Sequence, residues 1–333
     1  MQGLREVNRN IPVCVTGANG FVGLHVVRRL LEDGFKVHAT VRDKNDLRKT
    51  DALMRVAKGK SGTLQLFSAD LLQVGSFREA VRGCSVVYHT ASPFLISNVK
   101  NPFEQVLEPA LKGTQNVLDA VNEEDSVQRV VLTSSIAAIR DRVPSNGGST
   151  FTEEDWNQTT VDQDSSAGMV YAYSKAAAER KAWNMANSQA RWDLVVINPA
   201  LVLGPSLSEH ATSESFEIVK NWVSGDVENA RIVLVDVRDV ADAHLAAGTR
   251  VTASGRYLLV AETTFRRRVL DLIHQMYPGK YPPKELSKDV ETQVGFDFDN
   301  KRSRTDLSIS YRPLEETIRD AVESYETLRN SRL

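Results

Sequence analysis

The fold is decided by one stretch near the start of the chain, Thr16-Gly17-Ala18-Asn19-Gly20-Phe21-Val22-Gly23. A β-branched run precedes this stretch and an amphipathic helical pattern follows it, so the glycines fall in a strand-to-helix turn. Gly17 permits the tight turn, Gly20 lets the backbone approach a pyrophosphate, and Gly23 lets the helix pack closely on the sheet. The spacing is G-x-x-G-x-x-G, one residue longer than the G-x-G-x-x-G of many dinucleotide-binding folds. In this context it predicts a dinucleotide site, with the anion at the helix N-terminus, rather than a purely structural turn.

Short apolar runs and amphipathic segments alternate along the first part of the chain. The runs rich in β-branched residues are 13–16, 36–41, 63–67, 85–89, 129–133 and 193–198. Apolar residues three or four apart predict helices at 21–32, 46–57, 76–82, 103–122 and 171–188. This alternation predicts an α/β fold, a doubly wound, Rossmann-like parallel sheet with helices on both faces. Ligands then bind at the carboxyl ends of the strands.

The alternation loosens after Asn198-Pro199. A helix ending at Trp222 and another at residues 314–328 predict a smaller, mostly helical cap over the strand ends. A strand at 232–235, a helix at 240–247 and a strand at 257–260 look like a return to the sheet. We therefore expect a dinucleotide-binding domain of residues 1–200 plus 232–260, and a substrate-binding cap of residues 201–231 plus 261–333.

Composition excludes several classes of function. The 333 residues are 41% hydrophobic and 25% charged, with a net charge of -2, which is typical of a soluble globular protein. Nothing indicates a nucleic-acid or membrane surface, and no apolar run reaches the ~18 residues of a transmembrane helix. Cys14 and Cys84 lie in apolar stretches typical of buried strands, so we expect neither a disulfide nor a metal site. A cytoplasmic protein, monomer or homodimer, is expected.

Tyr171 and Lys175 are four residues apart in a predicted helix, which places both side chains on one face. A free phenol has a pKa of about 10, and a nearby cation favours the phenolate, so we expect Lys175 to lower the pKa of Tyr171. In the reducing direction, the tyrosine donates its proton to the nascent alkoxide. The spacing alone also fits an ordinary amphipathic helix. The glycine loop upstream is what favours hydride transfer.

Arg42 follows the second predicted strand, ~20 residues beyond the glycine loop, where a carboxylate would bind the adenosine ribose of NAD. An arginine there pairs with a 2′-phosphate and stacks on adenine, which favours NADPH, and Lys44 lies close by. Asp43 could serve the ribose instead, and a solvated charged loop containing Arg48 is the other interpretation. The loop residues expected to contact the cofactor are Gly17, Asn19, Gly20, Phe21, Val22 and Gly23.

Polar residues also follow the next three predicted strands. Asp70 and Leu71 follow the third, where a carboxylate can meet the adenine amino group, and Thr90-Ala91-Ser92 follows the fourth along the cofactor. The fifth ends in Thr133-Ser134-Ser135. A hydroxyl at that position can hold a carbonyl oxygen beside Tyr171 and stabilise the charge that develops on it.

Together these motifs resemble the extended short-chain dehydrogenase/reductases, and within them the dihydroflavonol reductase group, which includes cinnamoyl-CoA reductases and fungal aldehyde and ketone reductases. The resemblance spans nearly the whole chain. Its pieces are the glycine loop, Thr40-Val41-Arg42-Asp43, Thr133-Ser134-Ser135, Tyr171 with Ser174-Lys175, Asn198-Pro199-Ala200-Leu201-Val202-Leu203-Gly204-Pro205, and Val237-Arg238-Asp239-Val240-Ala241.

The resemblance implies a catalytic set of Ser135, Tyr171 and Lys175, with Lys175 also bonding the nicotinamide ribose. Ser135, immediately before Ile136-Ala137, fits the family's catalytic serine better by position than Ser134 does. Thr133, Pro199 and Val202 are expected at the cofactor, the last two at its carboxamide end.

The segment after the fifth strand, Ile136-Ala137-Ala138-Ile139, lacks the asparagine or glutamine that orients dihydroflavonols, so we do not expect a flavonoid substrate. The Asn-Trp-Tyr-Cys tetrapeptide of plant cinnamoyl-CoA reductases is also missing near that strand. Arg266-Arg267-Arg268 keeps a coenzyme A or sugar-nucleotide diphosphate site open. The expected pocket residues are Phe94, Ile136, Ala137, Leu201, Phe216 and Trp222; cap core is an equal interpretation for the last two.

These observations predict an NADPH-dependent reductase of an apolar aldehyde or ketone, with a small-molecule carbonyl substrate. An epimerase or dehydratase acting on a nucleotide sugar and a hydroxysteroid-type dehydrogenase remain alternatives. A dinucleotide-sensing regulator is a third, but such proteins commonly lack the catalytic tyrosine that is present here as Tyr171.

Overall fold

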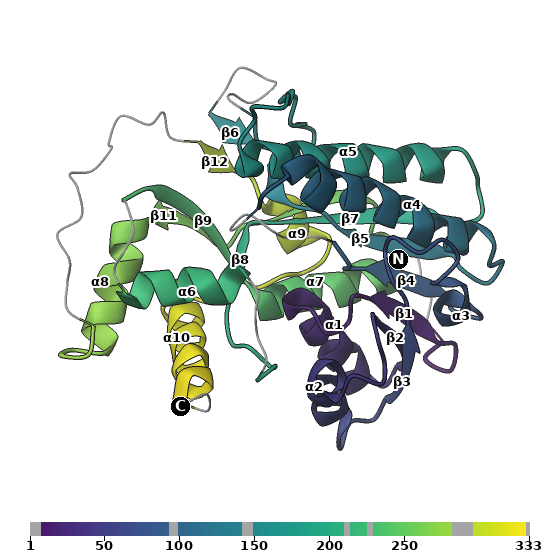
Figure 1. Cartoon of the computed structure of the whole chain (residues 1–333), viewed down its shortest axis with the longest axis horizontal. Coiled ribbons are helices and arrows are strands. Elements are labelled where there is room, and N and C mark those ends of the chain that lie inside the picture. The colour runs from purple at the N-terminus through teal and green to yellow at the C-terminus, as the bar shows by residue number, and fades with distance from the viewer. Residues whose placement is uncertain are drawn as a thin grey trace.

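A computed structural model describes residues 8–92, 99–141, 149–209, 214–224, 229–281 and 296–330. Its centre is a sheet of seven strands in the order β10-β7-β5-β4-β1-β2-β3, all paired in parallel (Figure 1). The strands are β1 (Val13–Thr16), β2 (Lys36–Val41), β3 (Thr63–Ser68), β4 (Val86–His89), β5 (Arg129–Thr133), β7 (Asp193–Pro199) and β10 (Gly255–Leu259). The predicted α/β, doubly wound fold is confirmed.

Helices cover both faces of this sheet. Figure 1 shows α4 and α5 on one side and α1, α2 and α7 on the other. Neighbouring strand residues point to opposite faces: Val13 and Val15 pack with α1, whereas Cys14 packs with α4. Both faces of the inner strands are therefore buried, which explains why β1, β4, β5 and β7 are apolar without alternation. The helices are α1 (Phe21–Glu32), α2 (Leu47–Ala57), α3 (Arg78–Val81), α4 (Glu108–Asn122), α5 (Ala167–Asn187) and α7 (Val237–Thr249).

Strand order positions the candidate site. The chain runs outward through β2 and β3 on one side of β1, then returns to β4 and continues outward on the other side. The loops that leave β1 and β4 therefore diverge, and a crevice opens between them at the carboxyl ends of the strands. The glycine loop follows β1, and Thr90 to Ser92 follow β4, so both border this switch point.

A second layer, formed by later segments, lies over one end of the sheet. It contains a three-stranded sheet in the order β11-β9-β8 and a separate apolar core between helices. Figure 1 shows α6, α8 and α10 grouped at the side remote from β3. The elements are β8 (Leu201–Leu203), β9 (Arg231–Asp236), β11 (Glu262–Phe265), α6 (Glu214–Ser224), α8 (Arg266–Met276) and α10 (Leu314–Asn330).

The strand expected at 232–235 exists as β9, but it does not join the central sheet. It pairs in parallel with β8 and antiparallel with β11, while α7 and β10 do return to the main sheet. Local alternation identifies a strand but carries no signal for which sheet the strand joins. The expected division into two domains remains a prediction.

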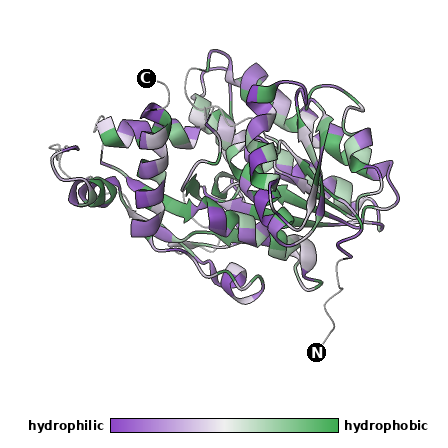
Figure 2. Ribbon diagram, turned by 90° about the horizontal axis from the view of Figure 1, so that it is seen from below, coloured by the Kyte–Doolittle hydropathy of each residue, from purple (hydrophilic) through white to green (hydrophobic). Residues whose placement is uncertain are grey.

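Smaller elements complete the described chain. They are the π-helical turn Phe103–Leu107, the 3₁₀ turn Ile136–Ala138, the paired strands β6 (Thr150–Phe151) and β12 (Asp297–Phe298), and α9 (Lys301–Thr305). Figure 2 shows hydrophobic residues concentrated in the central strands and hydrophilic residues on the outer helix surfaces. Within the described ranges, no helix combines the length and apolar character needed to cross a bilayer.

Candidate active site

The glycine loop is pressed against the end of β4. Gly17 has φ of 63°, and a Cβ there would lie 2.8 Å from the Ala91 Cα. A Cβ at Gly23 would collide with the Gly17 carbonyl and lie 2.8 Å from Thr90 Oγ1. Thr90 Oγ1 in turn donates to the Thr16 carbonyl at 2.6 Å. Gly17 and Gly23 are therefore required by the turn and by its close approach to β4.

The N-terminus of α1 suits a diphosphate. Gly20 is the N-cap, it is exposed, and no side chain within the described residues caps the helix. The first turn carries no acidic residue, so nothing opposes an anion there. Asn19, Phe21 and Val22 are half-buried around this end. The first N–H groups of an α-helix have no partner within the helix, and beside a turn with no room for a Cβ they fit the pyrophosphate of a dinucleotide.

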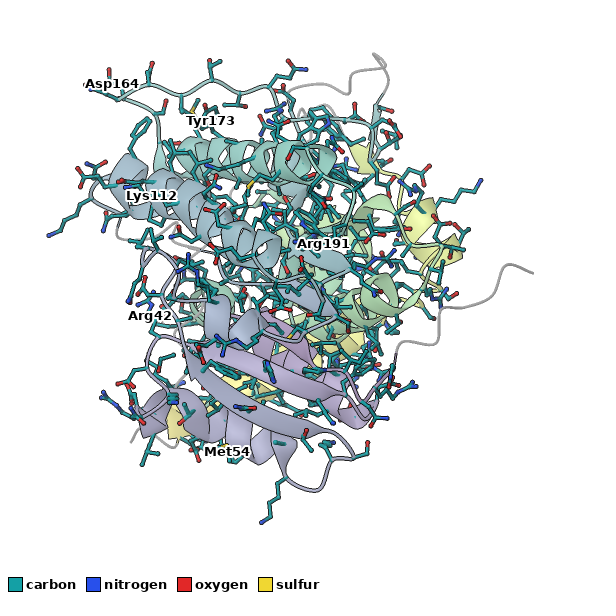
Figure 3. All side chains as sticks on the ribbon, turned by 90° about the vertical axis from the view of Figure 1, so that its right-hand side faces the viewer. Arg42, Met54, Lys112, Asp164, Tyr173 and Arg191 are labelled. Atoms are coloured by element: carbon teal, nitrogen blue, oxygen red, sulfur yellow. The ribbon has the colours of Figure 1, made fainter. Side chains whose placement is uncertain are left out.

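The predicted cofactor-selecting residues follow β2 at the surface. Arg42 and Lys44 are exposed, and Figure 3 shows Arg42 at the margin of the ribbon. Asp43 is engaged locally, because its Oδ1 accepts from Asn45 N at 2.9 Å. Arg48 lies 3.4 Å from Asp46 Oδ1. Within the described part of the chain Arg42 has no ion-pair partner, which leaves its guanidinium available to a phosphate.

The other predicted cofactor residues differ in their contacts and in their burial. Asp70 Oδ1 accepts from Leu72 N at 2.8 Å, so that carboxylate shapes its own loop. Leu71 packs against α4, where a Cβ on Gly113 would lie 2.7 Å from its side chain. Thr133 Oγ1 lies 2.6 Å from His244 Nε2, so this hydroxyl is directed toward α7. Pro199 is buried at the end of β7, whereas Thr90, Ala91, Ser92 and Val202 are half-buried.

The three predicted catalytic side chains lie together. The hydroxyl groups of Ser135 and Tyr171 share a hydrogen bond. Lys175 Nζ lies 5.7 Å from the centroid of the Tyr171 ring and donates to Ser92 Oγ at 3.0 Å. Ser135 leaves β5, Tyr171 and Lys175 come from α5, and Ser92 follows β4. The group therefore lies across the switch point from the glycine loop.

Burial dominates the electrostatics of this group. It raises the pKa of Tyr171 to about 12, although the bond to Ser135 opposes the rise. The expected lowering by Lys175 is thus not the net direction, because loss of hydration penalises the phenolate more strongly. Burial also lowers the pKa of Lys175 to about 8, against the attraction of Glu179. At neutral pH the tyrosine is therefore neutral and most of the lysine is charged.

Ser134 and Ser135 point to different partners. Ser134 is buried, and its Oγ donates to Glu179 Oε2 at 2.6 Å. Ser135 Oγ accepts from Ala137 N at 3.1 Å, caps the 3₁₀ turn, and bonds Tyr171. Only Ser135 of the two therefore faces the phenol.

Three residues of this region were missed by sequence reasoning. Glu179, the Asn198 side chain and Arg256 form a buried network behind the Ser135 turn. A signal for Glu179 did exist, since it continues the four-residue stripe of Tyr171 and Lys175 on α5. Arg256 offered a weaker one, as a charge inside an otherwise apolar strand.

The expected pocket residues come from two parts of the fold, the turn after β5 and the later segments that contain β8 and α6. Ile136 and Ala137 are half-buried beside Ser135, and Leu201 is half-buried on β8. Phe216 packs on Tyr325 at 5.2 Å between ring centroids. It lines a small pocket that reaches Phe21 of the glycine loop and also contains Leu203, Gly204, Ser206, Ser215, Val219, Ala321 and Ser324.

Two expected pocket residues differ from this pattern. Trp222 is only 4% exposed and belongs to the apolar core of α6, α8 and α10, which favours the cap-core interpretation. Phe94 lies outside the described residues. Among the residues that are described, no cluster of His, Cys, Asp and Glu could hold a metal ion.

A doubly wound parallel sheet with a glycine loop at its switch point defines the class of dinucleotide-binding α/β proteins. The NAD dependent epimerase/dehydratase family matches residues 13–260, and the chain belongs to that family. The predicted membership of the extended short-chain dehydrogenase/reductases is thereby confirmed, together with a nicotinamide dinucleotide as cofactor.

Several of the similar proteins are reductases by name. The chain is 38% identical to cinnamoyl-CoA reductase CAD2 of Medicago truncatula over 94% of both chains. It is 34% identical to tetraketide alpha-pyrone reductase 1 of Arabidopsis thaliana, again over 94% of both. Among solved structures, yeast methylglyoxal/isovaleraldehyde reductase Gre2 complexed with NADPH aligns with a TM-score of 0.84 and 29% identity, covering 96% of this chain and 99% of that one.

Proposed function

We propose that this protein reduces an aldehyde or ketone to an alcohol with NADPH, and that Tyr171 is the proton donor. The observation that carries the proposal is the bonded pair of Ser135 and Tyr171 with Lys175 beside the phenol ring. The reductases among the similar proteins support the same reaction type. We also propose a small-molecule substrate, handled by a cytoplasmic monomer or homodimer.

The exposed Arg42 supports NADPH rather than NADH. Its guanidinium has the planar donor geometry that pairs with a phosphate, and Lys44 adds charge to the same loop. Asp43 accepts from a backbone amide nearby, so its carboxylate is already used in the turn. The glycine loop and the uncapped N-terminus of α1 would hold the diphosphate.

The side chains divide the remaining work. Bound NADPH supplies the hydride. Ser135 holds the substrate oxygen beside Tyr171, whose phenol is protonated at neutral pH because burial raises its pKa to about 12. Once Tyr171 gives its proton to the oxygen, the charged Lys175 stabilises the phenolate that remains. A protonated tyrosine is suited to carbonyl reduction, because in that direction the tyrosine donates its proton to the substrate oxygen.

Apolar walls support a substrate with an apolar body. Ile136, Ala137, Leu201 and Phe216 are half-buried apolar residues, and we propose that they form the walls of the substrate site. Such walls bind aliphatic or aromatic groups through burial and leave orientation to a few polar contacts, here Ser135 and Tyr171.

The test is consumption of NADPH, with NADH in parallel, against aliphatic and aromatic aldehydes, ketoesters, diketones, dihydroflavonols and a cinnamoyl-CoA thioester. We expect turnover of apolar aldehydes or ketones with freely exchanging cofactor, and faster turnover with NADPH. No turnover of any carbonyl compound, together with a nicotinamide that stays bound through purification, would contradict the proposal in favour of an epimerase or dehydratase.

A further inference from the structure

Glu179 is a buried carboxylate in the wall of the candidate active site. It lies one helical turn beyond Lys175 and two beyond Tyr171, on the same stripe of α5. Its side chain is fully buried, with 0% exposed. A charged group in such a place is costly unless it is paired and hydrogen-bonded.

Four donors converge on the two carboxylate oxygens. Ser134 Oγ and Asn198 Nδ2 donate to Oε2 at 2.6 and 2.9 Å. Arg256 Nε donates to Oε1 at 2.6 Å, and Trp183 Nε1 lies 3.4 Å from the same oxygen. Both oxygens are thus satisfied, and the guanidinium of Arg256 places a positive charge directly against the carboxylate.

The same network fixes the backbone that carries Ser135. Asn198 Nδ2 also donates to the Ser135 carbonyl at 3.1 Å, so one amide joins the carboxylate to the turn. Arg256 Nη1 donates to the carbonyls of Glu153 and Asp155 at 2.9 and 2.5 Å. The guanidinium also lies 3.9 Å from the centroid of the Trp156 ring. The carboxylate therefore sits where β5, β7, β10 and α5 meet behind Ser135.

Among the residues that the structure describes, few groups place a charge near Lys175. Glu179 is one turn away on α5, and its attraction raises the pKa of the ammonium against the effect of burial. On β4, His89 is buried and neutral, since burial and Lys175 lower its pKa to about 3. From β10, Arg256 is paired with Glu179. Ser92 and Tyr171 are uncharged contacts of Lys175.

We propose that Glu179 is a positioning residue: its carboxylate fixes the turn that presents Ser135 and places a negative charge one helical turn behind Lys175. This rests on the proposed carbonyl reduction. A purely structural ion pair would hold the fold together but would leave the titration of Lys175 unchanged, and a buried ion pair is by itself weak support for stability.

The experiment compares E179Q with E179D and with D193N. Asp193 is the control for a carboxylate–arginine pair away from the site: its side chain is half-exposed and bonds Arg129 through two contacts of 2.7 Å at the opposite end of β7 from Asn198. For each variant, kcat and KM are measured from pH 6.5 to 10, and NADPH affinity is measured over the same range by fluorescence titration. K175M identifies the part of each profile that belongs to Lys175.

We expect E179Q to lower kcat by ~30-fold or more, and to move the alkaline midpoint of both profiles to lower pH by on the order of 1 unit. E179D should restore much of the midpoint shift, since it keeps the charge, and D193N should match the wild type. If E179Q does not fold because Arg256 is left unpaired, the neutral double variant E179Q/R256Q is measured instead, and the same direction of shift is expected.

Unmoved midpoints in E179Q, or in the double variant, would overturn the proposal even if kcat falls, because the role would then be structural. If the wild type reduces no carbonyl compound, the proposed function fails separately. The pH dependence of NADPH affinity still shows whether Glu179 controls Lys175.

Discussion

The two sides of the crevice are built from different chemistry. On the sheet side, hydroxyl, ammonium, carboxylate and guanidinium groups bond one another between β4, β5, β7, β10 and α5. On the cap side the larger side chains pack in an apolar core, such as Phe216 against Tyr325 and the buried Trp222. Rigid, bonded groups can hold a reacting oxygen in place, whereas apolar walls mainly set shape. The sheet side should therefore control rate, and the cap side should control substrate choice.

The most severe test of this contrast is Y171F. Removing the phenolic hydroxyl takes away the proton donor but leaves the ring, so we expect kcat to fall by ~10³-fold or more. NADPH affinity should stay within about twofold of wild type, as measured by fluorescence titration. Substantial turnover in Y171F would remove Tyr171 from the proposed reaction.

The adjacent serines give the next largest effect. S135A loses the hydroxyl that bonds Tyr171, and we expect kcat to fall by ~100-fold with little change in NADPH affinity. S134A removes only one of the donors to Glu179, so a smaller loss of about tenfold is expected. Steady-state kinetics on both variants measures the two losses of kcat. A larger loss in S134A than in S135A would mean that Ser134, and not Ser135, is the catalytic serine.

Cofactor choice is a property of the sheet side that can be changed alone. R42D replaces a cation with an anion where a 2′-phosphate is expected, so KM for NADPH should rise by about 10- to 100-fold while KM for NADH changes little. R48D is the control, because Arg48 already lies against Asp46. An unchanged preference for NADPH in R42D would mean that Arg42 is only a surface charge.

The pH dependence follows from the lowered pKa of Lys175. The charged ammonium is the form that stabilises the phenolate, so kcat/KM for reduction should fall about tenfold per unit as pH rises above about 8. The contribution of Lys175 to the free energy of unfolding changes in the opposite direction. Because its pKa is lowered on folding, this contribution increases as pH rises from about 8 toward 10.5. A loss of rate in that window without unfolding, followed by circular dichroism, separates the two effects. A rate that rises through pH 8 would contradict the assignment.

The smallest effects belong to the cap. F216A should raise KM for bulky apolar carbonyl compounds about threefold to tenfold. We expect kcat to change little, because the substitution removes apolar contact area and leaves the catalytic side chains in place. W222A should instead lower the free energy of unfolding by about 3–5 kcal/mol, since its ring fills the cap core. Urea unfolding and kinetics on both variants test the distinction. If W222A has normal stability and a selective rise in KM, Trp222 is a pocket residue and not part of the cap core.

The local sequence was sufficient to predict those features that depend on residues close together in the chain. The glycine loop lies between a strand and a helix that the pattern locates to the residue, and Ser135 and Tyr171 meet as their positions implied. Sheet order is a global property, so β9 was expected in the wrong sheet. The same holds for the carboxylate of Glu179, whose donors lie on α5, β10 and the ends of β5 and β7.

The pKa of Tyr171 illustrates why part of the site could not be predicted. The spacing to Lys175 correctly gives their shared face, but the net shift depends on how much water the folded chain excludes from the phenol. Exclusion of water is produced by segments distant in sequence. Residue spacing therefore predicts which groups meet more reliably than it predicts their protonation.

The most direct test of the central claim follows the hydrogen itself. NADPH carrying deuterium on one or the other face of nicotinamide C4 is supplied in separate reactions with the best carbonyl substrate, and the alcohol is analysed by mass spectrometry. The proposed reduction predicts one deuterium on the former carbonyl carbon from one face only, with equimolar NADP⁺ formed. Product without deuterium from either form, or turnover with no net oxidation of NADPH, would contradict hydride transfer to a carbonyl.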